Sequence, residues 1–318
     1  MEIKVSIIIP VFNVAAYLET CLSSCVNQTF RDIEIIVVND GSTDESPLII
    51  QKYAEKDDRI KVITKENEGL IYARKSGLDI AQGEYVFHLD GDDYIEIDAI
   101  DELYSKAVNS GADYVIGHFY SVRDKKKYEE RIYYDLDGLS GQDFLLKMLD
   151  AKWNIWGRLI HISLFDNLIY YPVFSGEDLF LNMQIALNVK KTVVVDLCLY
   201  NYVTRPGSVT QIKEKNIYFE LDIVKVKSIL YLLDIYNYNK QIREVVHLMF
   251  ITFYVDCMIW KRMEIKPILY DYYWSKKEIM SFLWKNRKKY YLVLNIFFRL
   301  PLIVSPLLKL YYSMMKKQ

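Results

Sequence analysis

The first hundred residues alternate between short apolar runs and longer stretches in which apolar positions recur with helical spacing. The apolar runs have the length and the β-branched content of buried strands. They span residues 4–10, 33–38, 60–63 and 85–89. The stretches with helical spacing span residues 14–27, 46–56 and 69–81. Strands that alternate with helices predict βαβ units, and therefore an α/β fold with a mostly parallel sheet flanked by helices.

Polar loops follow three of the predicted strands. They are Pro10–Asn13, Asn39–Asp44 and Asp90–Asp93. Ligands of such sheets bind outside the carboxyl ends of the strands, where these loops would all lie. We therefore expect the three loops to surround one crevice.

The third loop, Asp90-Gly91-Asp92-Asp93, places three carboxylates within four residues. Like charges repel one another, and a buried carboxylate is costly unless something neutralises it. Mg²⁺ and Mn²⁺ bind oxygen ligands, usually one or two carboxylates together with substrate phosphates. A solvated acidic turn at Gly91 is the alternative. The position of the loop at the predicted sheet edge favours a metal and phosphate site.

Four segments in this part of the chain, taken in order, resemble the family 2 glycosyltransferases, the inverting class built on the GT-A fold. They are Val5–Asn13, Val37–Asp44, Asn67–Arg74 and Ala81–Asp93. Gly176–Asp178 and Arg205–Thr210 also resemble the family, so the resemblance covers about the first two thirds of the chain. Each motif alone is weak, but their order and spacing identify the chain as a member. The resemblance implies a GT-A nucleotide-diphospho-sugar transferase fold.

The resemblance implies a nucleotide-sugar donor, typically UDP-linked. Asp40 would accept a hydrogen bond from the base, because a carboxylate suits an imide N–H; a turn-forming role before Gly41 is the alternative. Arg205 and Ser208 suit a pyrophosphate and lie in a loop that the family uses as a flexible lid, although an ordinary surface loop has the same composition. The predicted donor-binding residues are Pro10, Val11, Phe12, Asn13, Asp40, Arg74, Asp90, Gly91, Arg205 and Ser208.

The resemblance also implies a divalent metal cofactor, Mn²⁺ or Mg²⁺, at the acidic loop. Asp92 would be the direct ligand, Asp90 would lie near the ribose and the metal, and Asp93 is a weaker candidate. A metal there would bridge the pyrophosphate and stabilise the leaving nucleoside diphosphate. Arg74 would order the acidic cluster or reach the phosphates; a surface salt bridge is the alternative.

Inverting transfer needs a general base that removes the proton of the acceptor hydroxyl. Glu177 and Asp178 come directly before a predicted helix at residues 179–187, where acidic residues also complement the helix dipole. The family places its base at the second residue of this pair, so Asp178 is the predicted base and Glu177 its orienting partner. Trp153 and Trp156 form either a stacking platform for a sugar of the acceptor or part of the core.

The C-terminal part of the chain differs in charge from the rest. Residues 1–100 contain 9 Lys and Arg against 19 Asp and Glu, whereas residues 240–318 contain 15 against 5 and are rich in aromatic residues. The apolar stretch at residues 292–310 contains Arg299, Lys309 and two prolines. These interruptions make it a poor membrane-spanning helix.

We expect a GT-A catalytic domain at residues 1–212 and a helical, basic and aromatic region at residues 213–318. Helical patterns in the second region span residues 216–236, 241–262 and 274–289. Residues 285–318 would contact the membrane peripherally, with their Lys and Arg side chains facing anionic headgroups. A helical accessory region packed on the catalytic core or on a dimer partner is the alternative.

Composition argues against other partners and compartments. A pI of 6.2 and the absence of a recognisable nucleic-acid-binding motif argue against nucleic acid. The four cysteines form no Cys-x-x-Cys motif, which fits a reducing cytosol. The chain starts directly with a strand, so no signal peptide is predicted. The expected location is the cytoplasm, at the inner face of the cell membrane.

The predicted function is that of an inverting, metal-dependent glycosyltransferase. It would move one sugar from a nucleotide-sugar to a hydroxyl of a glycan acceptor, itself lipid-linked, in surface-polysaccharide biosynthesis. One alternative is a catalytically inactive nucleotide-sugar-binding or scaffolding subunit of a polysaccharide assembly complex, which the retained Asp90, Asp92 and Asp178 disfavour. Another is a nucleotidyltransferase, which the absence of a Gly-rich phosphate loop near the N-terminus disfavours.

Overall fold

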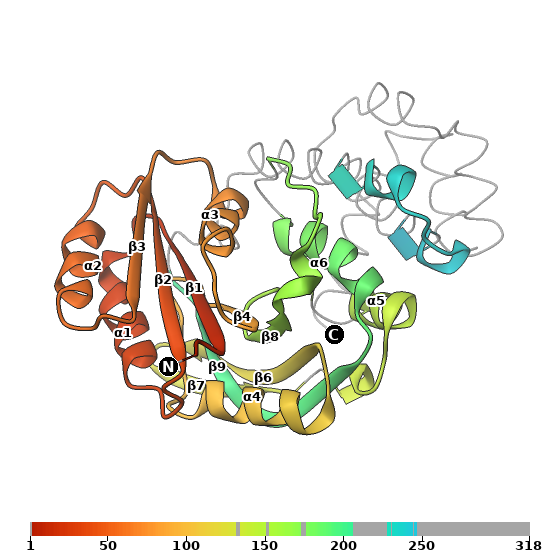
Figure 1. The fold of residues 1–318 in the computed structure, drawn as a ribbon, viewed down its shortest axis with the longest axis horizontal. Helices are drawn as coiled ribbons and strands as arrows, with labels where there is room; N and C mark the ends of the chain where they lie inside the picture. Colours follow the sequence, from red (N-terminus) through yellow and green to blue (C-terminus); the bar gives the residue numbers. More distant parts are fainter. Residues whose placement is uncertain are drawn as a thin grey trace, which may run out of the picture. The chain divides into compact units, whose positions relative to one another are not determined.

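The computed structural model describes residues 2–131, 134–150, 153–172, 176–205, 228–229, 231–243 and 245–246. The chain divides into two compact units, Met1–Ile242 and Arg243–Gln318, and nearly all described residues belong to the first. The first unit contains one mixed β-sheet with helices packed against it (Figure 1).

Four parallel strands and three helices form the first half of the sheet, as the hydrophobic pattern predicts. The strands are β1 (Val5–Val11), β2 (Ile33–Asp40), β3 (Ile60–Lys65) and β4 (Tyr85–His88). The helices between them are α1 (Ala15–Val26), α2 (Ser46–Ala54) and α3 (Leu70–Leu78). The strand order is β3-β2-β1-β4, and each neighbouring pair is parallel. Helices α1 and α2 lie on one side of these strands and α3 lies on the other (Figure 1).

Strands β1 and β2 are buried along their whole length, because helices cover both of their faces (Figure 1). Strands buried on both faces have continuous apolar runs rather than alternating ones, which explains their sequences. A Cβ added at Gly77 of α3 would come within 2.5 Å of Cγ2 of Ile8 in β1. The glycine therefore lets α3 pack closely on the sheet, and the same helix carries Arg74.

The second half of the sheet is mixed, whereas we expected a mostly parallel sheet. It contains β5 (Tyr94–Ile95), β6 (Tyr114–Arg123), β7 (Lys126–Glu130), β8 (Arg158–His161) and β9 (Thr192–Val203). Strand β8 is antiparallel to both β4 and β6, while β6 is parallel to β9. Strand β5 is antiparallel to β9, and strand β7 is antiparallel to β6. The expectation rests on the βαβ pattern of the first hundred residues, and that pattern ends at β4.

Three further helices accompany this half of the sheet. They are α4 (Ala99–Ser110), α5 (Gly141–Asp150) and α6 (Glu177–Asn188), with short 3₁₀ helices at Tyr134–Leu136 and Ile162–Phe165. Helix α6 confirms the predicted helix at residues 179–187 and begins two residues earlier. Glu177 and Asp178 therefore occupy its first turn, where carboxylates interact favourably with the helix dipole.

Most of the expected C-terminal region, residues 213–318, lies outside the described residues. The expected domain boundary and the membrane-contacting residues 285–318 are among them, so both stay predictions. Near the end of the first unit, the hydroxyl group of Tyr238 donates a hydrogen bond to the carbonyl oxygen of Met183 in α6 at 3.1 Å. None of the helices formed by the described residues is long and apolar enough to cross a membrane.

Candidate functional site

The three polar loops after β1, β2 and β4 adjoin one another, as the sequence predicts. Oδ1 of Asn13 accepts hydrogen bonds from the backbone N–H groups of Thr43 at 2.8 Å and Asp44 at 3.3 Å. A Cβ added at Gly91 would lie 3.0 Å from the carbonyl oxygen of Pro10. The glycine thus allows the acidic loop to lie directly against the first loop. The predicted base-pocket residues therefore meet the predicted metal-binding residues at one edge of the sheet.

Two carboxylates of the acidic loop form ion pairs with different arginines. Oδ1 of Asp90 lies 2.9 Å from Nη2 of Arg74, and Oδ2 of Asp92 lies 2.5 Å from Nε of Arg205. The side chains of Asp90 and Asp92 are 22% and 21% exposed, whereas Asp93 is buried. Asp90 and Asp92 are therefore the two carboxylates that a ligand can reach.

Asp93 fastens the acidic loop to the end of β9. Its Oδ2 accepts a hydrogen bond from the hydroxyl group of Tyr200 at 2.6 Å, and its Oδ1 accepts one from the backbone N–H of Val203 at 2.7 Å. Burial, together with the charges of Asp92 and Asp90, raises the pKa of Asp93 well above its usual range. Because Asp93 is only 2% exposed and both of its oxygens contact β9, it supports the loop from the protein side.

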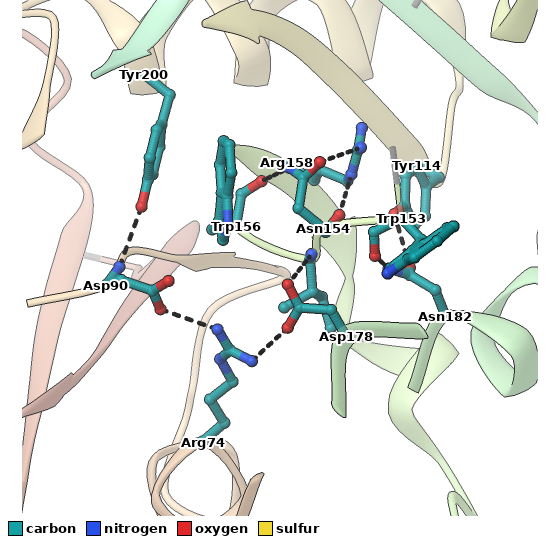
Figure 2. A network of polar contacts seen from close by, with 11 residues as sticks. Arg74, Asp90, Tyr114, Trp153, Asn154, Trp156, Arg158, Asp178, Asn182 and Tyr200 are labelled. Atoms are coloured by element: carbon teal, nitrogen blue, oxygen red, sulfur yellow. Dashed lines mark hydrogen bonds and ion pairs between the residues drawn. The ribbon is translucent and has the colours of Figure 1, made fainter. Parts of the chain in front are cut away.

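Arg74 joins the acidic loop to the predicted base (Figure 2). Its Nη1 lies 2.5 Å from Oδ1 of Asp178, while its Nη2 contacts Asp90, and its side chain is only 2% exposed. Oδ2 of Asp178 accepts a hydrogen bond from the backbone N–H of Ile155 at 3.1 Å. The surface salt bridge considered for Arg74 is therefore wrong. The arginine is buried, and it contacts one carboxylate from the loop after β4 and one from the first turn of α6.

The carboxyl groups around Arg74 repel one another. Burial, together with the charges of Asp178 and Asp92, raises the pKa of Asp90 to about 6, although Arg74 opposes this shift. Burial and the charge of Asp178 raise the pKa of Glu177 to about 7, against the opposing effect of Arg74. Both groups therefore change protonation near neutral pH. An added positive charge would favour their ionised forms.

Asp40, the predicted base-binding residue, is buried at the end of β2. Its Oδ1 accepts a hydrogen bond from the backbone N–H of Glu68 at 3.1 Å, and its Oδ2 accepts one from Gly69 at 2.9 Å. Asp40 thus holds the segment that leads into α3, and each oxygen keeps a second lone pair. Phe12 follows β1 and is 48% exposed, so its ring is open to a ligand. Contact of either residue with a base stays a prediction.

The two tryptophans of the predicted platform have different surroundings. The ring of Trp156 stacks on Tyr200, with centroids 4.4 Å apart and planes at 21°, and on Tyr202, with centroids 5.4 Å apart and planes at 9°. The carbonyl oxygen of Trp153 accepts a hydrogen bond from Nδ2 of Asn182 at 2.7 Å. Trp156 therefore packs between elements, as the core alternative expects. A sugar contact is untested for both.

Arg205 lies at the end of the described part of its loop. Besides its ion pair with Asp92, its guanidinium carbon lies 5.7 Å from the ring centroid of Tyr17 in α1. Ser208 lies outside the described residues, so the predicted pyrophosphate contact of this loop is untested.

Tyr200 is a buried side chain of the site that the sequence analysis did not identify. It contacts the acidic loop through its hydroxyl group and Trp156 through its ring. The sequence offers a single signal for it, the Tyr200-Asn201-Tyr202 run just before Arg205.

The acidic loop has a donor set that fits a divalent cation bound together with phosphate. Asp90 and Asp92 offer partly exposed carboxylate oxygens, which are ligands that Mg²⁺ and Mn²⁺ prefer. Part of the raised pKa of Asp90 comes from the neighbouring charge of Asp92, and a cation would relieve this repulsion. Within the part of the chain that the structure describes, no group of three or more His, Cys, Asp or Glu side chains is placed to hold a metal ion.

A family model and several known glycosyltransferases are similar to this chain. The family model described as "Glycosyl transferase family 2" matches residues 6–168, more than half of the chain. Glycosyltransferase GlyA of Streptococcus pneumoniae serotype 4 is 37% identical over 223 residues, which cover 66% of this chain and 32% of GlyA. The uncharacterized glycosyltransferase EpsJ of Bacillus subtilis is 33% identical over 220 residues, which cover 66% of this chain and 64% of EpsJ. The chain thus matches less than two thirds of the length of either relative.

Among solved structures, S. aureus TarS in complex with UDP-GlcNAc is similar, with a TM-score of 0.68 and 21% sequence identity. The similarity covers 88% of this chain and 80% of that chain. It shows a shared fold and confirms the predicted GT-A fold. The family model in turn confirms the resemblance that the motifs indicated.

Proposed function

Because this chain belongs to glycosyl transferase family 2, we propose that it transfers one sugar from a UDP-linked donor to a hydroxyl group of a glycan acceptor, with inversion at the anomeric carbon. The observation that carries the proposal is the position of Arg74, which contacts Asp90 and Asp178 at 2.9 Å and 2.5 Å. A direct displacement needs the donor site and the base side by side. The guanidinium of Arg74 contacts both Asp90, in the proposed donor site, and Asp178, the proposed base.

The nucleotide would bind across the loops after β1 and β2. Asp40 would accept a hydrogen bond from the N–H group of uracil, and the backbone of Pro10–Asn13 with the exposed ring of Phe12 would line the base pocket. Arg205 and Ser208 would contact the pyrophosphate. The complex of S. aureus TarS with UDP-GlcNAc supports a UDP-linked donor for a protein of this fold.

The partly exposed carboxylates of Asp92 and Asp90 would hold a divalent metal, Mn²⁺ or Mg²⁺. When bound, such an ion supplies positive charge to the leaving nucleoside diphosphate. In the structure Arg205 provides the positive charge beside Asp92. Its guanidinium would turn to the pyrophosphate when a donor occupies the acidic loop.

Asp178 would act as the general base. Its carboxylate would take the proton of the acceptor hydroxyl while the hydroxyl oxygen attacks the anomeric carbon from the face opposite the nucleoside diphosphate. The new glycosidic C–O bond forms as the C–O bond to phosphate breaks, so an α-linked donor gives a β-linked product. Arg74 and the N–H group of Ile155 hold the carboxylate in one orientation, and Glu177 would be its orienting partner.

The acceptor that we propose is a lipid-linked glycan of surface-polysaccharide biosynthesis, held at the cytoplasmic face of the membrane. Residues 213–318 would form an accessory region after a catalytic domain at residues 1–212. Within it, the mixture of basic and apolar side chains at residues 285–318 supports a peripheral contact with anionic lipid. Trp153 and Trp156 would contact a sugar of the acceptor.

The proposal is tested by incubating the full chain with a panel of UDP-sugars, Mn²⁺ and a lipid extract that contains glycan acceptors. UDP release and the linkage of the product are measured. Asp178→Asn should retain UDP-sugar binding and lose transfer, while Asp92→Asn should lose metal-dependent turnover. Asp98→Asn, at the exposed position before α4, is the control and should keep the wild-type rate.

Binding of UDP without turnover of any donor would overturn the proposal and favour a scaffolding subunit. Release of pyrophosphate in place of UDP would favour a nucleotidyltransferase. Near-normal turnover by Asp92→Asn would remove that residue as a metal ligand. A loss of donor binding in Asp178→Asn would give Asp178 a structural role.

A further inference from the structure

Tyr200 holds both ends of the acidic loop with a single hydroxyl group. It lies in β9 and is buried. The hydroxyl donates a hydrogen bond to Oδ2 of Asp93 at 2.6 Å and accepts one from the backbone N–H of Asp90 at 3.3 Å. The conformation of the loop between Asp90 and Asp93 therefore depends on a side chain from a distant strand.

The ring of Tyr200 contacts the loop that contains Trp156 and Gly157. It stacks on the ring of Trp156, with centroids 4.4 Å apart. A Cβ added at Gly157 would lie 3.3 Å from three ring and side-chain carbons of Tyr200, so the glycine lets this loop approach the ring closely. The residue before Trp156 is Ile155, whose backbone N–H donates to Asp178. Tyr200 thus reaches the predicted base through one short loop.

These contacts close a ring of interactions around the site (Figure 2). The ring runs from Asp90 through Arg74 to Asp178, then through residues 155–156 to Tyr200, and returns to the N–H group of Asp90. Arg74 links the acidic loop to the base by charge. Tyr200 links them by a second route that uses a hydroxyl group and a stacked ring.

An irregularity in the sheet determines where Tyr200 points. Strands β6 and β9 pair in regular register up to Gly117 and Val195, and the register then shifts twice before Phe119 pairs with Tyr200. Bulges of this kind change the direction of the following side chains and are frequent beside active sites. The irregular segment of β9 lies immediately before the residue that contacts the acidic loop.

We propose that Tyr200 is a positioning residue that fixes the acidic loop relative to Trp156 and Asp178, so that the metal and the donor phosphates bind at the place where the base can act. This inference rests on the proposed function and deepens it. Asp90 and Asp92 supply the ligands, and the hydroxyl of Tyr200 holds the backbone that presents them.

The test uses the full chain with Tyr200→Phe, which keeps the stacked ring and removes only the hydroxyl. Tyr85→Phe is the matched control, because Tyr85 is also buried in the sheet and its hydroxyl donates to the carbonyl oxygen of Ala112 at 3.0 Å. Mn²⁺ is titrated calorimetrically in the presence of UDP. We expect the affinity for Mn²⁺ to fall about tenfold in Tyr200→Phe and to stay within about twofold of wild type in Tyr85→Phe.

A second measurement does not depend on any ligand. Amide hydrogen exchange of the peptide that contains Asp90–Asp93 should become faster in Tyr200→Phe, because the N–H group of Asp90 loses its acceptor. The same peptide should exchange at the wild-type rate in Tyr85→Phe. If Tyr200→Phe does not fold, Asp93→Asn replaces it for the exchange measurement alone: it weakens the acceptor that orients the Tyr200 hydroxyl, so the peptide should again exchange faster, whereas its affinity for Mn²⁺ would also reflect the lost charge.

Wild-type Mn²⁺ affinity in a folded Tyr200→Phe protein overturns the proposal, as does an equal loss in both tyrosine variants. Wild-type amide exchange in the loop of the Tyr200→Phe protein overturns it too. A wild-type chain that binds neither Mn²⁺ nor UDP overturns the proposed function instead. In that case the exchange measurement still decides whether Tyr200 positions the loop.

Discussion

Arg74 on α3 and Asp178 on α6 lie 104 positions apart in the sequence and 2.5 Å apart in the structure, measured between Nη1 and Oδ1. The same guanidinium lies 2.9 Å from Asp90 through Nη2. The arginine therefore links the acidic loop directly to the predicted base. Both the stability of the protein and the geometry of the site should therefore depend on it.

Replacing Arg74 by Gln should destabilise the protein strongly. The change leaves Asp90 and Asp178 without their counter-charge, and removing one partner of a buried ion pair costs roughly 3–5 kcal/mol. Because these carboxylates are 22% and 16% exposed, we expect a loss near the lower end, about 3 kcal/mol in urea unfolding. Arg74→Lys keeps the positive charge but lacks the planar guanidinium that contacts both carboxylates. It should therefore lose less stability than Arg74→Gln.

Arg59→Gln is the control for this prediction. Arg59 pairs with Asp57 at 2.6 Å in a partly exposed turn away from the site. Its loss should cost about 1 kcal/mol or less. Equal losses at positions 59 and 74 would contradict a special role for the buried arginine.

Glu177→Gln should stabilise the protein in EDTA at about pH 8 and have little effect at about pH 5. Burial raises the pKa of Glu177 from 4.5 to about 7, so between these values the folded state binds a proton more tightly than the unfolded state. Stability therefore falls as the pH rises through this window, and above it the ionised carboxylate destabilises the fold. A neutral amide avoids that cost, which we expect to be about 1–3 kcal/mol.

The measurement is thermal unfolding of both proteins across this pH range. Glu45→Gln, at an exposed position before α2, is the control and should show a difference from wild type that does not change with pH. A pH-independent difference for Glu177→Gln as well, or a destabilisation at the higher pH, would contradict the raised pKa.

Arg205→Gln should bind Mn²⁺ alone more tightly than wild type and bind UDP less tightly. Arg205 neutralises Asp92, so a metal ion must compete with the guanidinium for that carboxylate. Partly exposed ion pairs contribute up to about 1 kcal/mol, so Mn²⁺ affinity should rise by about twofold to fivefold. UDP affinity should fall because the pyrophosphate loses a cation. Both are measured by titration calorimetry.

Lys52→Gln is the matched control, because it also removes one positive charge from an ion pair, with Glu19 at 2.6 Å on the surface. Neither affinity should change in this variant. Unchanged or weaker binding of Mn²⁺ alone in Arg205→Gln would show that the arginine does not compete with the metal.

Local pattern was sufficient to predict the first half of the fold. The run at residues 4–10 corresponds to β1 at Val5–Val11, and the helical pattern at residues 69–81 corresponds to α3 at Leu70–Leu78. These elements follow one another along the chain and pack as βαβ units, so each is specified by nearby residues. Strand β8 pairs antiparallel with β4, a partner from far earlier in the chain, and no local pattern encodes that choice.

The same division applies to the site. Asp90, Asp92 and Asp178 lie in segments that resemble the family's motifs, so the sequence singled them out as candidate site residues. Tyr200 could not, because its contacts depend on a register shift between β6 and β9 that only the assembled sheet defines. Asp93 belongs to the acidic motif, yet its partners also come from β9.

Asp40 and Asp44 make the same kind of contact at the end of β2. The two carboxylate oxygens of Asp40 accept hydrogen bonds from the backbone N–H groups of Glu68 and Gly69 at 3.1 Å and 2.9 Å. Those of Asp44 also accept hydrogen bonds from two backbone N–H groups, at 3.0 Å and 2.9 Å. Substitution of each aspartate by asparagine therefore removes one acceptor oxygen from a pair of backbone contacts, at a buried position for Asp40 and at an exposed one for Asp44.

Asp40→Asn should lose about 1–2 kcal/mol in urea unfolding, because an amide NH₂ group would face a backbone donor at a buried position, and Asp44→Asn, at an exposed position, should lose about 1 kcal/mol or less. Only Asp40→Asn should also lose affinity for UDP, by about tenfold, since we propose that Asp40 accepts a hydrogen bond from the base. Binding of Mn²⁺ with inorganic pyrophosphate, which has no base, should stay within about twofold of wild type in both variants. Two outcomes would mean that Asp40 acts through the loop before α3 and not through the base. One is that Asp40→Asn loses affinity for pyrophosphate as well as for UDP, and the other is that Asp44→Asn loses as much affinity for UDP as Asp40→Asn does.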